Sequence, residues 1–506
     1  MNNKRNYFLF WVAITLIAAS AVYQRFHGLS PKSLWLDDVW AALLARSASV
    51  SFIFNADVPC SPCFILLLKV IVFVFGAGEA QMQILPFCVS LTMVFLFAYL
   101  LLRFTKMFSL SIIAAVFIAA NPLITSYSLR VKPFILDSFI ILLILLLSTR
   151  CLERKDKESL YFLSILSALA IFVSYVSLFL SVFAVGILHW RLLAEKNVPK
   201  KAVIVSCLGY YVLFLVMYVF LIKGRGNPSL YVYWKEYYIP VESAKSCAEF
   251  LKNKGLMFFK GAFISKFSWL AVFIPLGIFR LIFDKEKRPI GLSIVCFYAS
   301  IIAAGVLKIY PIGGGRTDIF TFPISIFAAV VGVWTFAKRF KWSGVLLCAA
   351  VIVLFVKDSN TRAEYPNNFN KEAVQLLNKQ EKSDDAIIIF PWANWAVGYY
   401  GKWKPLFVKV EDSTNGFFVE PKRHNTYVLR ETWGGVDFRD SSDVITSQLA
   451  FMKNDQKRIL YLACSVFDVS KKPHEWIIEN IIARGYAVEY EEKFIDGCFM
   501  VFRKQS

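Results

Sequence analysis

Two adjacent carboxylates, Asp37 and Asp38, are the residues of this chain best suited to chemistry. They lie in the stretch Ser33–Trp40, which reads SLWLDDVW and places a tryptophan on each side of the acids. Carboxylates near a bilayer are costly and usually functional, although a solvated pair at the interface is the plain alternative. Adjacent residues on a helix point about 100° apart, so we expect two roles. One acid could accept a proton while the other supports it or binds a metal ion.

Two polar loops carry candidate anion-binding cations. Arg130 and Lys132 follow Tyr127 in one loop, and Arg316 follows the glycines 313–315 in another. Arginine binds phosphate through two parallel hydrogen bonds, and glycines let backbone amides approach an anion closely. Either loop alone is a weak signal, because cations and glycine turns are also ordinary features of connections between membrane helices.

The elements that must position these residues are membrane helices. The chain is 57% hydrophobic and only 18% charged, and apolar runs near 20 residues recur along it, as a helical membrane bundle requires. The net charge of +20 would fit a nucleic-acid partner, but the basic residues cluster between apolar runs, as the positive-inside rule predicts. We therefore expect no nucleic acid. About eleven spans are predicted, at residues 7–23, 84–102, 108–125, 135–148, two within 160–192 that break near Ser174, 202–222, 263–283, 290–307, 319–336 and 344–356.

This assignment leaves the N-terminus in the cytoplasm and makes every inner connection basic. It puts Asp37, the loop 127–134, the aromatic loop 231–238 and the loop 310–316 outside. The apolar run 64–75 reaches only about 18 Å as a helix, too short for a hydrocarbon core of about 30 Å. We interpret it as an interfacial or re-entrant helix.

From Lys357 onward, short mixed patterns replace the long apolar runs. They predict strands at 386–390, 458–464 and 498–502 and helices at 371–377 and 475–484, typical of a small α/β domain. The expected domains are therefore a transmembrane domain, 1–356, and an extracytoplasmic α/β domain, 357–506.

The cysteines and histidines give no clear cofactor site. Cys60 and Cys63 have the spacing of a redox motif without its α/β context, which favours structural thiols or a local disulfide. Cys464 and Cys498 lie on predicted strands and could pair. No cluster has zinc-site spacing, and no phosphate-binding or dinucleotide-binding fingerprint stands out.

In this order, the pieces resemble the GT-C glycosyltransferases of family 39 type, which include the protein O-mannosyltransferases and the lipid A aminoarabinose transferase. A Leu-Trp-x-Asp-Glu motif is matched by 34–38, and a Pro-Pro-x-aromatic helix ending in Phe-Gly-x-x-Glu is similar to 61–79. A Tyr-Ser-x-Glu-x-Lys-x-Tyr-x-x-Asp loop matches Tyr127, Ser128, Lys132, Phe134 and Asp137, and a Tyr-Pro-x-Gly-Gly-x-Arg turn looks like 310–316. The match covers about residues 1–340 and implies the GT-C fold.

The resemblance implies an inverting transfer of a hexosyl or pentosyl group from a polyprenyl-phosphate-sugar to a glycan, lipid or protein acceptor. The reaction would take place among membrane lipids, on the outer face of the bacterial cytoplasmic (inner) membrane. Asp37 would be the general base with Asp38 in support. The donor phosphate would be bound by Lys132, Arg316 and Arg130, and substrate contacts are expected from Trp35, Tyr127, Asp137 and Tyr310. No cofactor is certain, and a divalent metal is possible.

Three positions depart from the family pattern. Asp38 replaces the usual Glu, Arg130 stands where relatives carry an acid, and Cys63 takes a position that is often Gly or Leu. Two other classes of function stay open. A transporter or flippase of lipid-linked glycans predicts interrupted helices in two similar halves, which the sequence does not display. A non-catalytic scaffold for glycan assembly predicts no dependence on Asp37.

Overall fold

The chain divides into two compact units. The computed structural model describes residues 2–26, 28–29, 33–56, 58–196, 198–222, 231, 233–339, 349, 353, 365, 368–410, 416–433, 436–450, 456–466 and 470–505. The first unit comprises Met1–Leu29, Gln83–Gly224 and Trp234–Glu364, and the second comprises Ser30–Met82, Arg225–Tyr233 and Tyr365–Ser506.

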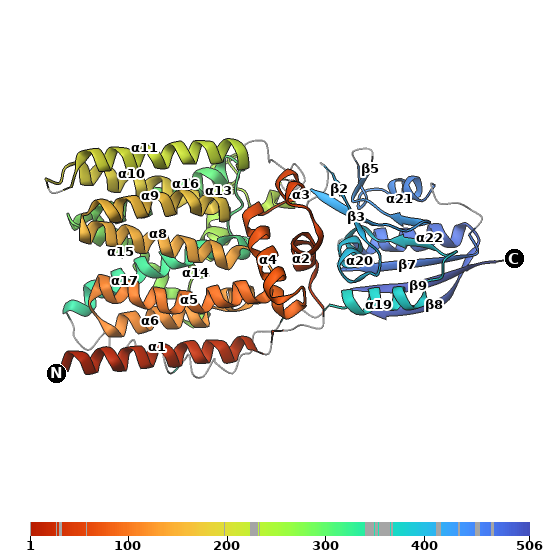
Figure 1. Ribbon diagram of the computed structural model, residues 1–506, viewed down its shortest axis with the longest axis horizontal. Helices are drawn as coiled ribbons and strands as arrows, with labels where there is room; N and C mark the ends of the chain where they lie inside the picture. The colour runs from red at the N-terminus through yellow and green to blue at the C-terminus, as the bar shows by residue number, and fades with distance from the viewer. Residues whose placement is uncertain are drawn as a thin grey trace. The chain divides into compact units, whose positions relative to one another are not determined.

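The first unit is a bundle of helices that lie side by side (Figure 1). Its α-helices are α1 (Asn2–Phe26), α5 (Glu79–Thr105, whose first turn belongs to the second unit), α6 (Phe108–Ala120), α7 (Pro122–Tyr127), α8 (Phe134–Arg154), α9 (Lys157–Val173), α10 (Leu178–Leu193), α11 (Lys200–Met217), α13 (Ala244–Phe250), α14 (Leu256–Lys260), α15 (Phe273–Phe283), α16 (Arg288–Val306) and α17 (Phe322–Arg339). Short 3-10 or π turns complete it: η1 (Tyr175–Ser177), η2 (Tyr218–Ile222), η3 (Lys235–Tyr237), η4 (Leu251–Gly255), η5 (Ser265–Val272) and η6 (Arg316–Thr321).

Eight helices of the described residues are long and apolar enough to cross a membrane. They are Lys4–Phe26, Glu79–Thr105, Phe134–Arg154, Tyr175–Leu193, Lys200–Phe220, Lys266–Phe283, Arg288–Val306 and Arg316–Thr335. Two shorter helices, α6 with 13 residues and α9 with 17, coincide with two more predicted spans. The predicted span 344–356 falls outside the described residues, apart from 349 and 353. The multi-spanning helical fold is confirmed, including the break at Ser174, which caps α9.

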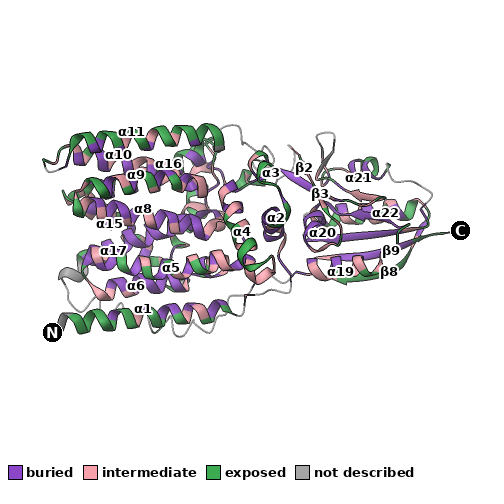
Figure 2. Cartoon of the chain, viewed as in Figure 1, coloured by how far each residue is buried: buried purple, intermediate pink, exposed green. Residues whose placement is uncertain are grey.

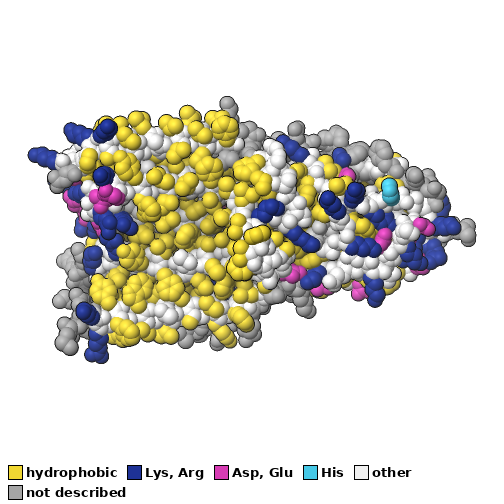
Figure 3. Space-filling view, viewed as in Figure 1, with side chains coloured by type: hydrophobic (Ala, Val, Ile, Leu, Met, Phe, Trp, Pro, Cys, Tyr) yellow, Lys and Arg dark blue, Asp and Glu magenta, His cyan; other side chains and the backbone are white. Residues whose placement is uncertain are grey.

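The surface of the bundle is apolar where it is exposed. On α11, whose residues are largely exposed in Figure 2, Leu208, Val212 and Leu215 are each about 60% exposed. Hydrophobic side chains cover most of the visible bundle (Figure 3). Inside, glycines allow close helix packing, because a Cβ atom at Gly277 or Gly332 would collide with the backbone of the facing helix in the α15–α17 pair. Small residues at helix contacts with lipid-facing apolar surfaces outside are typical of membrane bundles.

One end of the bundle gathers the basic connections (Figure 3). Arg103 at the end of α5 pairs with Glu153 at the end of α8. Lys155 Nζ lies 3.0 Å from Glu195, which follows α10, and 3.4 Å from Glu286, which follows α15. These ion pairs place four of the predicted inner connections at the same end of the bundle.

The second unit combines the segment before α5 with the C-terminal part of the chain. Its helices are α2 (Leu36–Ser47), α3 (Val50–Asn55), α4 (Pro62–Phe75), α19 (Asn370–Gln380), α20 (Asn394–Tyr400), α21 (Ser442–Leu449) and α22 (Lys471–Ala483), with the 3-10 turn η7 (Pro391–Ala393). Its strands are β1 (Ala386–Ile389), β2 (Pro405–Lys409), β3 (Phe417–Pro421), β4 (Thr426–Val428), β5 (Thr432–Trp433), β6 (Val436–Asp437), β7 (Arg458–Cys464), β8 (Tyr486–Phe494) and β9 (Gly497–Lys504).

A five-stranded mixed sheet with the order β4-β1-β7-β9-β8 forms the core of this unit. Strand β1 runs parallel to both of its neighbours, with Ile388 opposite Tyr427 and Tyr461. All four residues of β1 are buried, which explains its unbroken apolar sequence, since central parallel strands are covered on both faces. The three predicted strands and two predicted helices are therefore confirmed.

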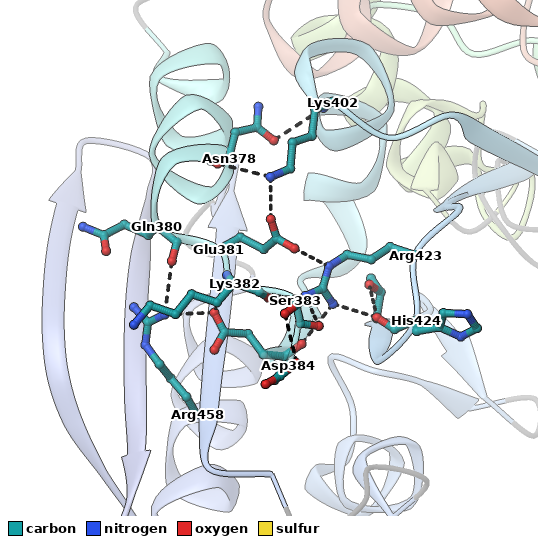
Figure 4. A network of polar contacts seen from close by, with 12 residues as sticks. Asn378, Gln380, Glu381, Lys382, Ser383, Asp384, Lys402, Arg423, His424 and Arg458 are labelled. Atoms are coloured by element: carbon teal, nitrogen blue, oxygen red, sulfur yellow. Dashed lines mark hydrogen bonds and ion pairs between the residues drawn. The ribbon is translucent and has the colours of Figure 1, made fainter.

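A network of charged groups ties α19, α20 and the sheet together (Figure 4). Glu381 Oε2 lies 2.5 Å from Lys402 Nζ, and Glu381 Oε1 lies 2.7 Å from Arg423 Nε. Arg458 on β7 bonds Asp385 just before β1, with an Nη1–Oδ2 distance of 2.9 Å. Such fully paired charges hold the start of the sheet against the helix that precedes it.

Residues 33–82 pack within the second unit rather than with the bundle. Helix α2 contacts α4 and α20, and a Cβ atom at Gly398 of α20 would lie 2.8 Å from Leu43 Cδ2 of α2. Helix α4 matches the predicted short apolar helix, and Phe73 on it is 90% exposed. The predicted domains placed residues 33–82 in the transmembrane domain and not with the C-terminal part. The predicted boundary after residue 356 lies outside the described residues.

Candidate active site

Asp37 and Asp38 occupy the first turn of α2, which begins at Leu36 directly after an extended Trp35. The N-terminal end of a helix favours negative side chains, because its free amide groups and dipole attract them. Asp38 is fully buried at 0% exposure, whereas Asp37 and Trp35 are partly exposed. The two acids therefore have different surroundings, as their adjacent positions on a helix predict.

Tyr365 fixes the buried acid. Its hydroxyl donates a hydrogen bond to Asp38 Oδ2 and accepts one from the Trp35 amide at 3.0 Å. A buried carboxylate needs such donors, because it has left its hydration shell behind. Asp38 is thus held by a donor inside the protein, whereas Asp37, on the same turn, is partly exposed.

The turn between α7 and α8 carries two buried cations. Arg130 is 6% exposed and Lys132 is 8% exposed. The Arg130 guanidinium lies 5.8 Å from the ring centre of Tyr127, and that ring packs edge-to-face against Phe134. Burying two like charges within three residues is costly unless other groups compensate them.

Side chains from α1 and α5 hold this turn in place. Gln83 Nε2 donates to Leu129 O at 2.7 Å. Arg25 Nε donates to Ser128 Oγ at 2.9 Å, and its Nη1 donates to Ala21 O at 3.0 Å. Arg25 and Gln83 are fully buried, so the turn is supported from inside the bundle rather than by solvent.

The glycine turn differs from the sequence-based expectation. The Gly313 amide donates to Asp318 Oδ1 at 3.2 Å, and the Gly315 amide donates to Asp318 Oδ2 at 3.1 Å. These two amides therefore serve an internal carboxylate of η6 and do not form an open cradle for an anion. The Arg316 guanidinium lies 5.1 Å from the ring centre of Trp234.

Tyr310 connects the glycine turn to α8. Its hydroxyl donates to Thr317 O at 2.8 Å, and burial, followed by the charges of Asp137 and Asp318, raises its pKa well above the usual value. Asp137, in the first turn of α8, is 8% exposed and lies beside Ser174. The structure thus brings Tyr310 and Asp137, two predicted site residues, close together.

The predicted outer loops meet at one end of the bundle. Ile312 N donates to Tyr237 O at 2.8 Å, which joins the glycine turn to the aromatic segment. Lys254 Nζ lies 3.6 Å from the centre of the Tyr237 ring, and η6 contacts both α7 and α8. Tyr127, Arg130, Lys132, Asp137, Tyr310 and Arg316 all belong to this first unit, and Trp35, Asp37 and Asp38 belong to the second.

Four residues of these surroundings were missed from the sequence: Tyr365, Asp318, Trp234 and Lys254. Trp234 carried a weak signal as part of an aromatic loop. Asp318 lies two residues after Arg316 in a glycine-rich turn, where carboxylates often accept backbone amides. Tyr365 lies in no recognisable motif, and its partner Asp38 is 327 positions away.

Within the described part of the chain, no three His, Cys, Asp or Glu side chains lie close enough to hold a metal ion. Neither the local disulfide considered for Cys60 and Cys63 nor the pairing of Cys464 on β7 with Cys498 on β9 is formed. Burial raises the pKa of the Cys498 thiol to about 12, which keeps it protonated and unreactive.

The comparisons with known proteins show the fold of the chain. No family model matches it, and no curated protein matches its sequence. The crystal structure of ArnT from Cupriavidus metallidurans bound to undecaprenyl phosphate matches with a TM-score of 0.51 at 11% identity, over 98% of this chain and 97% of that one. The apo structure of ArnT from Cupriavidus metallidurans matches with a TM-score of 0.49 at 10% identity, over 99% and 98%. The GT-C fold expected from the resemblance is confirmed by the first match.

Proposed function

We propose that this protein is a membrane glycosyltransferase that moves a sugar from a polyprenyl-phosphate donor to an acceptor hydroxyl, with inversion of the anomeric carbon. The observation that carries the proposal is the contrast between the two adjacent acids. Asp38 is buried and bound by Tyr365, whereas Asp37 stays accessible on the same helical turn. A general base must be within reach of the acceptor, and a neighbouring acid that is held by a donor can support it.

The proposed chemistry is a single displacement. The acceptor hydroxyl oxygen attacks the anomeric carbon of the donor, and its proton passes to Asp37. The bond between the anomeric carbon and the phosphate oxygen breaks, and the lipid phosphate leaves as a dianion. Lys132, Arg130 and Arg316 are the cations proposed to neutralise that charge, because positive groups aimed at a developing anion lower the barrier.

The donor class is supported by two observations. The solved neighbour with the same fold holds undecaprenyl phosphate, and two buried cations lie on the α7–α8 turn of this chain. A polyprenyl phosphate suits such a site, since its head group needs cations and its tail needs a lipid phase. We expect a hexosyl or pentosyl donor and a glycan, lipid or protein acceptor.

The proposed location is the cytoplasmic membrane of a bacterium, with the reaction on the outer face. The gathered basic connections mark the opposite end of the bundle, and basic connections stay in the cytoplasm. The turns that carry Arg130, Lys132 and Arg316 would then face outward.

The test is to measure lipid phosphate release by purified protein in lipid nanodiscs. Undecaprenyl phosphates bearing single hexoses or pentoses are offered with a mixture of cell-envelope lipids and glycans, and the products are followed by mass spectrometry. For Asp37→Asn we expect a loss of at least about a hundredfold, the usual contribution of a general base.

The chain offers a matched control in a second pair of adjacent acids. Asp384 is exposed and Asp385 is buried against Arg458, yet neither belongs to the proposed site. Asp384→Asn should keep turnover within about twofold of the wild type, because surface substitutions rarely disturb a distant site. Near-normal turnover of Asp37→Asn would show that the acid pair is not the active site, as both a transporter and a scaffold predict.

A further inference from the structure

The backbone just before α2 is bonded almost entirely by the C-terminal part of the chain. Tyr400 Oη accepts a hydrogen bond from the Leu34 amide at 2.7 Å. Asn370 Nδ2 donates a hydrogen bond to Leu34 O at 2.9 Å. Asn368 Nδ2 donates to Ser33 O at 3.2 Å. Residues 33–35 form no helix or strand, so their backbone groups depend on these partners.

Further contacts join the end of α2 and the segment after α4 to the C-terminal part of the chain. Lys371 Nζ pairs with Glu79 at 2.8 Å, and Tyr399 Oη donates to Ala77 O at 2.5 Å. Arg46 Nη1, in the last turn of α2, donates to Tyr399 O at 2.7 Å. The acid-bearing helix is therefore held at its start and its end by residues that follow it by more than 300 positions.

We infer that the C-terminal part of the chain is the frame that positions the two acids, and that Tyr365 is the positioning residue that sets Asp38. Tyr365 contacts the acid stretch at two points, the Asp38 carboxylate and the Trp35 amide. One hydroxyl thereby fixes both the last extended residue and the first helical turn. Without that hydroxyl, the Asp38 carboxylate and the Trp35 amide would each lose one hydrogen bond, and the turn that carries Asp37 would be held less firmly. This inference rests on the proposed function for its effect on catalysis, but the positioning itself does not.

The test compares two tyrosine-to-phenylalanine variants of the full chain in nanodiscs. Tyr365→Phe removes the hydroxyl that touches the acid stretch. Tyr486→Phe removes the hydroxyl of a tyrosine that is also buried, with 2% exposure, and that bonds Gln456 O instead. Hydrogen–deuterium exchange of peptides covering 33–40 is the readout that requires no activity. We expect at least tenfold faster exchange of the Trp35 and Asp38 amides in Tyr365→Phe and wild-type exchange there in Tyr486→Phe.

The second readout is turnover with a saturating lipid donor. Tyr365→Phe should lower kcat about tenfold to a hundredfold, the range that misplacement of a catalytic group by about 1 Å produces. It should leave the KM for the donor unchanged, because the donor cations lie on other elements. The losses from Asp38→Asn and Tyr365→Phe should combine to less than their product, since the two changes share the Asp38–Tyr365 contact.

The outcomes separate the two ideas. Unchanged exchange over 33–40 in Tyr365→Phe would overturn the positioning role, whatever the turnover. Faster exchange with wild-type kcat would overturn its link to catalysis. If Asp37→Asn keeps full turnover while the exchange responds as expected, the proposed function is wrong and the frame remains.

Discussion

At the scale of single residues, three acids with little exposure are each held by hydrogen-bond donors or counter-charges. Glu381 illustrates the balance (Figure 4). Burial opposes its ionisation, but the hydrogen bonds and charges of Lys402 and Arg423 outweigh that effect and hold its pKa below the usual value. Asp38 meets the same need with Tyr365, and Asp318 meets it with two glycine amides. Each of these three acids is thus held by named hydrogen-bond donors.

The depressed pKa of Glu381 predicts a pH-dependent contribution to stability. The contribution is present above the ordinary pKa of glutamate, about 4.3, and is lost as the pH falls through the lower folded-state pKa. Glu381→Gln should lower the free energy of unfolding at pH 7 by about 2 kcal/mol, as breaking a buried charged hydrogen bond does. The gap from the wild type should close below about pH 4.

Unfolding by denaturant, followed by tryptophan fluorescence at pH 7 and at about pH 2.5, measures this difference. The control is Glu489→Gln, whose partner Arg503 is 64% exposed, and we expect a change within about 0.5 kcal/mol there. An equal loss in both variants, or a gap that persists unchanged at the lower pH, would contradict the pairing as the source of stability.

At the scale of elements, α1 supports the turn between α7 and α8 through one arginine. Arg25 is fully buried, and its Nη2 has no hydrogen-bond partner among the described residues. Its Nε and Nη1 donate hydrogen bonds to Ser128 Oγ and Ala21 O. In the part of the chain that the structure describes, no carboxylate pairs with the guanidinium. Its positive charge therefore adds to that of Arg130 and Lys132 on the turn that it holds.

Arg25→Lys should weaken donor binding, because a lysine cannot reproduce the two-pronged geometry. We expect the KM for the lipid donor to rise about tenfold, equal to about 1.4 kcal/mol, with kcat nearly unchanged. Arg103→Lys is the control, since it changes an arginine of α5 that pairs with Glu153 at the basic end. A KM that rises equally in both variants would assign the effect to the bundle as a whole.

At the scale of the whole molecule, the helices sort their connections by charge. The connections joined by Lys155, Glu195 and Glu286 form one end of the bundle, and the turns with Arg130 and Arg316 form the other. The positive-inside rule places the first end in the cytoplasm. The predicted last span, 344–356, would then place the C-terminal part of the chain outside.

Reporter fusions test this topology. Alkaline phosphatase, which is active only outside the cytoplasm, should be inactive when fused after Lys196 and active when fused after Lys260 or Ser506. A green fluorescent protein at the same three points should give the opposite pattern. An active phosphatase after Lys196, or a fluorescent fusion after Ser506, would reverse the proposed orientation.

The sequence by itself determined the features that depend on local composition. Membrane helices, the break at Ser174 and the buried strand Ala386–Ile389 follow from runs and periods of apolar residues, because burial in lipid or between two layers demands them. The charged edge strand Tyr486–Phe494 was missed, since its mostly exposed residues carry no such pattern. The resemblance to GT-C enzymes predicted the fold that the solved neighbour shares.

Only the tertiary structure decided which distant groups complete the polar surroundings. Nothing near Asp38 in the sequence points to Tyr365, 327 positions later, and nothing in the glycine turn says whether its amides bind a ligand or Asp318. The packing of residues 33–82 within the C-terminal unit was equally hidden. Local patterns report how much of a segment is buried, whereas hydrogen-bond partners depend on which segments the whole fold brings within about 3 Å of one another.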